Sequence, residues 1–218
     1  MERPKVILLD AVGTLFGVKG SVGEVYSQIA KEFEVEVSAQ ILNTTFVQSF
    51  KAAPPATFPN ADLHDIPQQE FEWWRKIAFN TFKSAGVLPQ FSDFPGFFSE
   101  LYIHFGTAEP WFIYPDVVSS LIDWQQQGIE LGIVSNFDSR IFSVLESLEL
   151  SSYFTSITIS TQARVTKPDP TIFAIALEKH NCPSTAAWHI GDSIVDDYQG
   201  AKAAGLRGIW INRQTLEI

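Results

Sequence analysis

Polar side chains that could act together follow hydrophobic segments at four places in the sequence. Asp10 comes directly after the apolar run at residues 6–9 and is followed by Gly13 and Thr14. The other groups are Ser135 with Asn136, Lys167, and the pair Asp192 and Asp197. A single aspartate after a strand often does no more than begin a turn, so each signal alone is weak. An acid, a hydroxyl–amide pair, a lysine and a Gly-Asp-Ser-x-x-Asp-Asp run in this order are much harder to explain by chance.

The carboxylates of this set fit the coordination chemistry of magnesium. Mg²⁺ prefers an octahedron of oxygen ligands, which Asp10, Asp192, a backbone carbonyl and water molecules could supply. Asp197 lies one helical turn after Asp192, where it would orient that ligand or hold a metal-bound water. Lys167 would offset the repulsion between the acids and an anionic substrate. We therefore expect Mg²⁺ as the cofactor.

The hydroxyl and amide groups fit the binding of a phosphoryl group. Thr14, Ser135, Asn136 and the backbone N–H groups after Asp10 could each donate a hydrogen bond to a phosphoryl oxygen. One oxygen of Asp10 would remain free to attack phosphorus in line, which gives an aspartyl phosphate that water later cleaves. The expected partner is a small anionic, phosphorylated substrate.

These groups can meet only if the segments before them form one sheet. From residue 110 onward, apolar runs alternate with helical patterns roughly every 20–30 residues, which indicates βαβ units and a parallel sheet. The expected strands are residues 6–9, 129–136, 156–161, 187–190 and 208–211. Ligands of such a sheet bind beyond the carboxyl ends of its strands, which is where the polar groups would converge.

The segment between the first strand and residue 110 has a different pattern. Helical periodicity covers residues 22–33, 38–51, 70–85 and 97–105, whereas residues 52–68 carry four prolines and no periodicity. The predicted fold class is therefore α/β, a Rossmann-like parallel sheet with helices on both faces plus an inserted all-helical domain. The predicted core comprises residues 1–17 and 110–218, and the predicted insertion comprises residues 18–109.

The composition limits the classes of partner. The chain has 218 residues, 45% of them hydrophobic and 18% charged, which is typical of a globular protein. Its net charge of −10 argues against nucleic acid, whose phosphates require a basic face. No apolar run approaches the ~20 residues of a membrane span, and the first residues lack the apolar core of a signal peptide. With Cys182 as the only cysteine, we expect a cytoplasmic protein without a membrane partner, and monomer and homodimer both remain open.

Four motifs of the sequence resemble those of the haloacid dehalogenase-like (HAD) hydrolase superfamily. DAVGTL is similar to its first motif with Asp10 as nucleophile, Ser135 to its second, Lys167 with Pro168 to its third, and GDSIVDD to its fourth. The helical insertion resembles the cap of subfamily I, which includes phosphoglycolate phosphatases and 2-haloacid dehalogenases. The run DAVGTLFGVKGSVGEVY is similar to a branch named after rhythmically expressed gene two. The resemblance implies magnesium dependence and hydrolysis of phosphate esters.

Val12 departs from the pattern of the phosphatases in this superfamily. Those enzymes carry a second aspartate two residues after the nucleophile, and it protonates the leaving group and later deprotonates water. The Val12 backbone carbonyl can still bind the metal, but its side chain transfers no proton. General acid–base catalysis contributes roughly 10²–10⁴-fold, so we expect weakened catalysis, above all for poor leaving groups.

Three functions therefore remain open from the sequence. The favoured one is a magnesium-dependent phosphatase with weakened acid–base catalysis. The second is a non-enzymatic binding or regulatory protein that retains the fold. The third is a metal-independent 2-haloacid dehalogenase, whose relatives also lack the second aspartate. A dehalogenase needs a basic, aromatic cap helix, for which Arg75 beside Trp73 and Trp74 is the candidate, but it does not need the acid pair Asp192 and Asp197.

Overall fold

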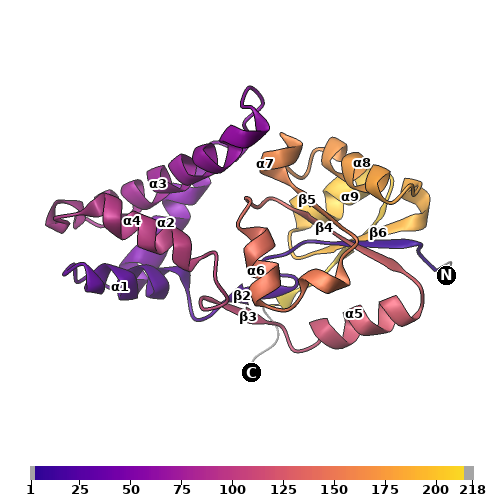
Figure 1. Cartoon of the computed structure of the whole chain (residues 1–218), viewed down its shortest axis with the longest axis horizontal. Coiled ribbons are helices and arrows are strands. Elements are labelled where there is room, and N and C mark those ends of the chain that lie inside the picture. Colours follow the sequence, from indigo (N-terminus) through magenta and orange to yellow (C-terminus); the bar gives the residue numbers. More distant parts are fainter. Residues whose placement is uncertain (1–2, 214–218) are drawn as a thin grey trace.

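The protein folds into two lobes, a core built on a parallel sheet and a helical cap (Figure 1). The structure is a computed structural model and describes residues 3–213. The core sheet has five parallel strands in the order β5-β4-β1-β6-β7, and helices cover both of its faces. The predicted fold class, a Rossmann-like α/β fold with an inserted helical domain, is confirmed.

The elements follow one another with these bounds. The strands are β1 (Val6–Leu9), β2 (Phe16–Val18), β3 (Trp111–Ile113), β4 (Glu130–Ser135), β5 (Ser156–Ile159), β6 (Ala187–Gly191) and β7 (Arg207–Trp210). The α-helices are α1 (Val22–Glu32), α2 (Ala39–Ala52), α3 (Ile66–Ser84), α4 (Phe94–His104), α5 (Val117–Gln126), α6 (Ile141–Ser147), α7 (Ser160–Ala163), α8 (Pro170–Lys179) and α9 (Gly200–Ala203). A π-helical turn, η5 (Ile194–Gln199), precedes α9.

The central strand β1 is apolar throughout because the core covers it on both faces. Ile7 and Leu9 pack into the cluster that includes α5 and α6, whereas Val6 and Leu8 pack into the cluster that includes α8 and α9. Successive side chains of a strand point to opposite faces, so a strand without a polar residue predicts this two-sided burial. Asp10, the first polar residue after β1, is thereby placed at the carboxyl edge of the sheet.

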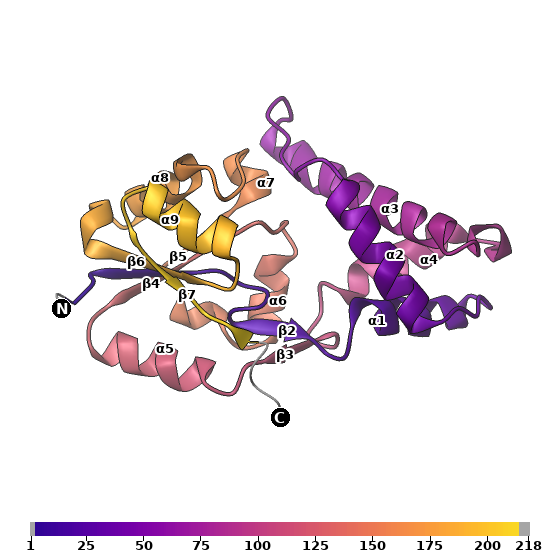
Figure 2. The same cartoon turned by 180° about the vertical axis from the view of Figure 1, so that it is seen from behind.

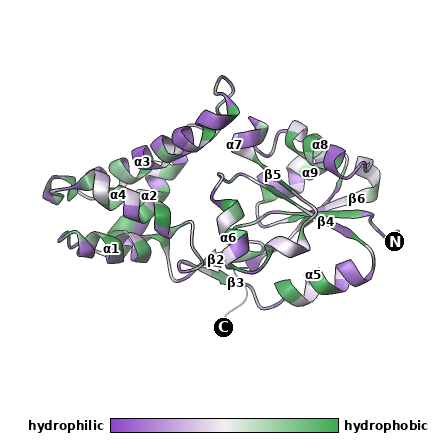
Figure 3. Ribbon diagram, viewed as in Figure 1, coloured by the Kyte–Doolittle hydropathy of each residue, from purple (hydrophilic) through white to green (hydrophobic). Residues whose placement is uncertain are grey.

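The cap is held together by aromatic packing among α1, α2, α3 and α4. Hydrophobic and hydrophilic residues alternate along these helices, as expected when each helix buries one face (Figure 3). Phe82 and Phe97 are fully buried, with ring centroids 4.9 Å apart in an edge-to-face arrangement. The cap therefore has its own hydrophobic core, separate from the two core clusters that flank the sheet.

The two segments that join cap and core pair with each other. β2 and β3 form a two-stranded antiparallel ribbon in which Phe16 faces Ile113 and Val18 faces Trp111. The sequence interpretation missed both strands, because three residues are too few to show an alternating pattern. The predicted domain boundary after residue 17 falls inside β2, and the one before residue 110 falls just before β3.

Several predicted boundaries shift by a few residues. The irregular proline-rich stretch extends only to the short helical turn Leu63–Asp65, and α3 begins at Ile66 instead of residue 70. The strand expected over 156–161 ends at Ile159, and the last strand is Arg207–Trp210. The tip of the cap lies beside α7 in both views, where Arg164 donates to the carbonyls of Pro59 and Ala61 (Figures 1 and 2).

Within residues 3–213, none of the helices is long and apolar enough to cross a membrane.

Candidate active site

The strand order brings the predicted polar groups to one edge. β1 pairs with β4 on one side and with β6 on the other, so the segments after these three strands are neighbours. They carry Asp10, Ser135 and Asp192, respectively, while the loop that follows α7 supplies Lys167. Asp10, Ser135, Asn136, Lys167, Asp192 and Asp197 all line one pocket of about 150 Å³, together with Val12.

Lys167 is the centre of a buried ion network. Its Nζ lies 2.6 Å from Asp10 Oδ1 and 2.6 Å from Asp197 Oδ1, and its side chain is 2% exposed. Burial alone would lower the pKa of this lysine, but the two carboxylates outweigh burial and raise it. Lys167 is therefore a fixed cation that holds one oxygen of Asp10 and leaves the other oxygen available for attack.

Asp197 is fully engaged by neighbouring donors. Besides Lys167, Oδ1 accepts from His189 Nε2 at 2.9 Å, and Oδ2 accepts from the Ser193 backbone N–H at 2.9 Å. Burial would raise the pKa of Asp197, but the hydrogen bond from His189 and the charge of Lys167 hold it well below its usual value. Burial lowers the pKa of His189, so a neutral imidazole donates this bond. Because both carboxylate oxygens are occupied, Asp197 fits a role that orients the site.

Asp192 is the most accessible acid of the set. Burial and then the charge of Asp10 raise its pKa to about 6, and its side chain is the exposed member of the acidic cluster. One oxygen from each of Asp10, Asp192 and Asp197 lies within 4.8 Å of the others. Oxygen ligands of Mg²⁺, bound at 2.0–2.1 Å, lie about 3 Å apart when adjacent and about 4.2 Å apart when opposite. The donor set and its spacing therefore fit Mg²⁺ after small side-chain movements.

The turn after β1 brings the backbone close to Asp192. Gly13 has φ +85°, which favours glycine, and a Cβ there would lie 2.5 Å from Asp192 Oδ2. A side chain at position 13 would require the Asp192 carboxylate to move, and it would also be strained by the positive φ. The turn is closed by the bonds from the backbone N–H groups of Thr14 and Leu15 to the carbonyl of Ala11.

Of the three side chains predicted to bind phosphate, Ser135 and Asn136 line the pocket and Thr14 does not. Ser135 is buried, lines the pocket and makes no hydrogen bond through its hydroxyl to any residue in 3–213, so it is available to a ligand. The Asn136 side chain instead clamps the lysine loop: Nδ2 donates to the carbonyl of Lys167 at 3.1 Å, and Oδ1 accepts from its N–H at 2.8 Å. The second N–H of the Asn136 amide has no hydrogen-bond partner among residues 3–213, so it could donate to a ligand.

Thr14 does not reach the pocket. Its side chain is 2% exposed, its hydroxyl has no hydrogen-bond partner in the described part of the chain, and it is not among the residues that line the site. Its carbonyl accepts from Arg213 Nη2 at 2.8 Å. The turn at Ala11 directs the threonine toward the core, so the structure does not bring this predicted phosphate ligand to the others.

A second pocket adjoins the catalytic one, between cap and core. We call it the aromatic pocket; its volume is about 260 Å³. Its lining residues are Val12, Val18, Val22, Tyr26, Phe46, Phe50, Trp74, Phe98, Leu101, Tyr102, Phe105, Trp111, Asn136, Phe137 and Arg140. Among the cap residues in this set, the sequence interpretation considered only Trp74 for a site, because aromatic residues at helical spacing also indicate a core. The hydrophilic signal that could have been followed is Asp138 and Arg140, directly after the second motif.

Asp138 and Arg140 tie the cap to the core. Arg140 Nε and Nη2 donate to the two oxygens of Asp138 at 2.9 and 2.7 Å, and Nη1 donates to the carbonyl of Tyr102 at 3.1 Å. Trp74 Nε1 also donates to Asp138 Oδ2, at 2.6 Å. Asp138 Oδ1 also accepts from the Arg140 backbone N–H at 2.9 Å, just before α6 begins at Ile141. The same carboxylate therefore takes part in the start of this helix and in the contact between the lobes.

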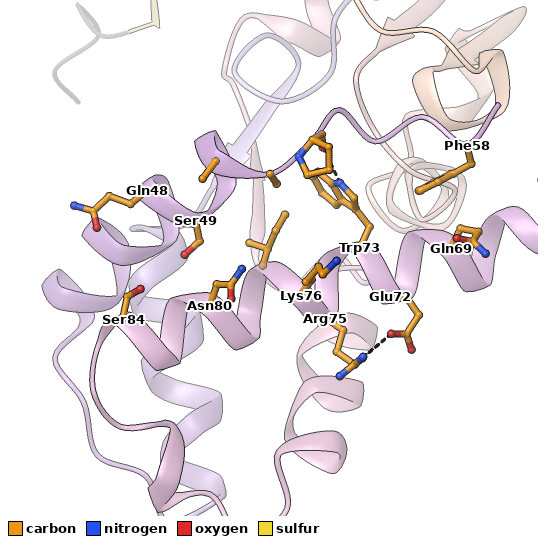
Figure 4. Close-up of a pocket in the computed structure, with 14 residues that line it drawn as sticks. Gln48, Ser49, Phe58, Gln69, Glu72, Trp73, Arg75, Lys76, Asn80 and Ser84 are labelled. Carbon is orange, nitrogen blue, oxygen red and sulfur yellow. Dashed lines mark hydrogen bonds and ion pairs between the residues drawn. The ribbon is translucent and has the colours of Figure 1, made fainter. Parts of the chain in front are cut away.

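Two other candidate residues lie away from the catalytic pocket. Arg75 is on the outer side of α3 and pairs with Glu72 at 2.7 Å, so it does not provide the inward-facing cation of a dehalogenase cap (Figure 4). His64, in the proline-rich stretch of the cap, is 79% exposed, pairs with Asp65, and lines neither pocket. The groove of Figure 4, between α2 and α3, also contains Trp73, whose Nε1 donates to the carbonyl of Pro54.

Comparison with known proteins agrees with this geometry. A family model described as haloacid dehalogenase-like hydrolase matches residues 4–205. Haloacid dehalogenase-like hydrolase domain-containing protein 3 of Danio rerio is 34% identical over 209 residues, which cover 95% of this chain and 85% of that protein. The rhythmically expressed gene 2 protein of Drosophila melanogaster is 27% identical and covers 99% of this chain and 85% of its own length.

The fold is shared with a solved structure that contains magnesium. It is the putative HAD-hydrolase YfnB from Bacillus subtilis, with a TM-score of 0.75 and 17% identity, over 100% of this chain and 92% of that chain. The family match and the relative at 34% identity both extend over most of the sequence. The chain therefore belongs to the haloacid dehalogenase-like hydrolase family.

Proposed function

We propose that this hydrolase is a magnesium-dependent phosphatase that acts through an aspartyl phosphate at position 10. The observation that carries the proposal is the convergence of Asp10, Asp192 and Asp197 on one small pocket, with Lys167 Nζ 2.6 Å from Asp10. In the proposal Asp10, Asp192 and the backbone carbonyl of Val12 hold Mg²⁺. When bound, Mg²⁺ would neutralise charge on the phosphoryl oxygens.

The first step needs a free carboxylate oxygen and a held phosphoryl group. The oxygen of Asp10 that does not contact Lys167 attacks phosphorus, and the bond from phosphorus to the leaving oxygen breaks with its electron pair on that oxygen. Lys167 and the Ser135 hydroxyl are the groups available to stabilise the equatorial oxygens. Water then attacks phosphorus, releases phosphate and restores Asp10, and its proton passes to solvent.

Val12 limits which leaving groups this site can expel. Its side chain lines the pocket beside Asp10 and can neither protonate a leaving oxygen nor deprotonate water. Leaving groups that depart as stable anions, such as carboxylates and phenolates, need no such proton. We therefore expect acyl and aryl phosphates to react faster than alkyl phosphates, by roughly the 10²–10⁴-fold that an acid–base group contributes.

We also propose a class of substrate, an oligomeric state and a cellular location for the enzyme. The partner is a small anionic phosphorylated substrate, without nucleic acid or membrane, and the protein acts as a monomer or homodimer. A cytoplasmic location is part of the same proposal, and the free Cys182 is compatible with a reducing compartment.

The test is phosphate release from acetyl phosphate, phenyl phosphate and glycerol 3-phosphate, with magnesium, with EDTA, and with Asp10→Asn. We expect release from the first two that requires magnesium and Asp10. Magnesium binding without turnover of any member would favour a binding protein. Halide release from 2-chloropropionate in the presence of EDTA would instead establish a dehalogenase.

A further inference from the structure

The aromatic pocket is adjacent to the catalytic pocket. Val12, Asn136 and Phe137 line both. A molecule whose phosphoryl group binds at Asp10 therefore extends naturally into the aromatic pocket. The remaining walls come mainly from α1, α2, α3 and α4 of the cap, with further residues from the end of β2, the start of β3 and Arg140 just before α6.

The walls of this pocket suit a flat ring. Phe50 stacks on Trp74 with centroids 5.8 Å apart and on Phe46 with centroids 5.7 Å apart, at an interplanar angle of 25° in both pairs. Tyr26 meets Phe46 edge to face at 5.5 Å. Aromatic side chains in such arrangements bind a further ring by the same stacked or edge-to-face contacts.

The pocket offers no uncompensated charge. Arg140 is the only charged residue among the described residues that line it, and both oxygens of Asp138 pair with its guanidinium. The Tyr102 ring covers the same guanidinium, whose carbon lies 3.9 Å from the ring centroid. A charged group placed here would lose its hydration without gaining a free partner, so the occupant is uncharged.

The size of the pocket limits the occupant further. An apolar cavity of about 150 Å³ is large enough to bind benzene. The aromatic pocket, at about 260 Å³, therefore accommodates one ring with a small substituent or two fused rings. A long chain or a nucleoside with its sugar would extend beyond the pocket.

From these observations we propose that the aromatic pocket binds the leaving group of the substrate and that this group is an uncharged aromatic ring. The inference rests on the proposed phosphatase activity, because the phosphoryl group is placed at Asp10. It also fits the missing acid: Val12 continues the apolar wall up to the reacting centre, and aryl and aroyl leaving groups depart without a proton.

The substrate test separates ring binding from leaving-group chemistry. Acetyl phosphate and benzoyl phosphate both release carboxylates of similar basicity, but only benzoyl phosphate carries a ring. One methylene in an apolar pocket changes kcat/KM by roughly 10–200-fold, so we expect benzoyl phosphate to be favoured by at least about tenfold. Equal kcat/KM values would overturn the inference, and so would a preference for cyclohexanecarbonyl phosphate over benzoyl phosphate.

Matched variants test the pocket itself. Phe50→Ala removes an exposed aromatic wall, and Phe79→Ala removes an exposed phenylalanine of the cap that lines neither pocket. Val22→Phe fills the pocket, whereas Val47→Phe adds the same volume to the surface of α2. We expect Phe50→Ala and Val22→Phe to reduce the benzoyl to acetyl preference at least threefold, and we expect Phe79→Ala and Val47→Phe to leave this preference unchanged. An equal loss in the two controls would contradict the assignment.

A binding measurement keeps this inference separate from the proposed function. Phenylphosphonate and methylphosphonate cannot be hydrolysed, and calorimetric titration with magnesium present gives their Kd values without turnover. We expect phenylphosphonate to bind at least about tenfold more tightly and Val22→Phe to abolish the difference. Turnover of acetyl phosphate without this difference would reject the aromatic pocket alone. The difference without any turnover would reject the phosphatase proposal while leaving the pocket assignment in place.

Discussion

The catalytic pocket and the aromatic pocket are adjacent, but the first is lined mainly by charged and polar side chains and the second mainly by aromatic ones. In the first, buried charges such as Lys167 and Asp197 are held by strand ends and by one another. In the second, rings from the cap helices make the walls, and the one charged group, Arg140, is neutralised by Asp138. In the proposed function, the sheet holds the reacting groups, and the cap supplies the walls that select the leaving group. Val12 belongs to both pockets and connects the two.

The largest expected effect is on the catalytic pocket alone. Asp10→Asn removes the nucleophile, and loss of a nucleophile lowers kcat by roughly 10⁴-fold or more. Steady-state phosphate release from acetyl phosphate is the measurement. Phenylphosphonate binding should survive in this variant, so a parallel loss of binding would show that the two pockets are not separable.

Removing the fixed cation should affect stability as well as activity. Lys167→Met leaves Asp10 and Asp197 buried without their partner, which should cost about 3–5 kcal/mol of unfolding free energy. Urea denaturation at pH 7 measures it, and magnesium should restore part of the loss. Lys179→Met is the control, because Lys179 is exposed and bonds only to the carbonyl of Ile157. Equal losses in both variants would contradict the role of the ion network.

Restoring the missing acid tests Val12, one of the residues that line both pockets. Val12→Asp should raise kcat/KM for glycerol 3-phosphate by roughly 10²–10⁴-fold and change that for acetyl phosphate much less. Val12→Asn has a similar size but transfers no proton and should give no gain. If neither variant improves the alkyl ester, the explanation of Val12 is wrong.

Weakening the contact between cap and core should change the aromatic pocket more than it changes the catalytic pocket. Trp74→Phe removes the donor to the buried Asp138 carboxylate, and a hydrogen bond to a charged group contributes about 1.5–3 kcal/mol. Trp73→Phe removes only a bond to the Pro54 carbonyl and should cost about 0.5–1.5 kcal/mol. Thermal unfolding ranks the two variants. If Trp74→Phe leaves the ratio of kcat/KM for benzoyl and acetyl phosphate unchanged, the position of the cap does not determine selectivity.

The smallest effect concerns pH and the metal. Because the pKa of Asp192 is about 6, acidification below that value protonates this ligand and should weaken magnesium binding by about tenfold per pH unit. The metal-free protein should respond to pH in the opposite direction. The Asp192 carboxyl binds its proton more tightly in the folded protein than in the unfolded chain, so the free energy of unfolding should fall as the pH rises from about 4 to 6. Calorimetric titration at pH 5 and pH 7.5 measures the first effect, and Asp192→Asn should flatten it.

The convergence of the polar groups on one edge of the sheet could be predicted because strand ends are visible in the sequence. An apolar run followed by an acid marks both a buried strand and the edge where its loop emerges, as at Asp10. Thr14 shows the limit of this reasoning. Its sequence position is right for a phosphate ligand, but the backbone turn around the carbonyl of Ala11 directs its side chain into the core.

The aromatic pocket was not predictable in the same way. Trp74 and Asp138 are 64 positions apart, and nothing local to either residue indicates that they meet. Rings such as Tyr26 and Phe98 recur at helical spacing whether they fill a core or line a cavity, so the pattern favours core packing. The short ribbon of β2 and β3, which decides where the cap sits, is too brief for periodicity to reveal.

The most direct test of the account is to find the phosphoryl group on Asp10. Acetyl phosphate and magnesium are mixed with the protein, the reaction is quenched in acid, and borohydride reduces any aspartyl phosphate to homoserine for mass spectrometry. The account predicts homoserine at position 10, in greater amount in the wild-type protein than in Val12→Asp, because Val12 also slows hydrolysis of the intermediate. Phosphate release without a modified Asp10, or with the modification on another residue, would contradict it.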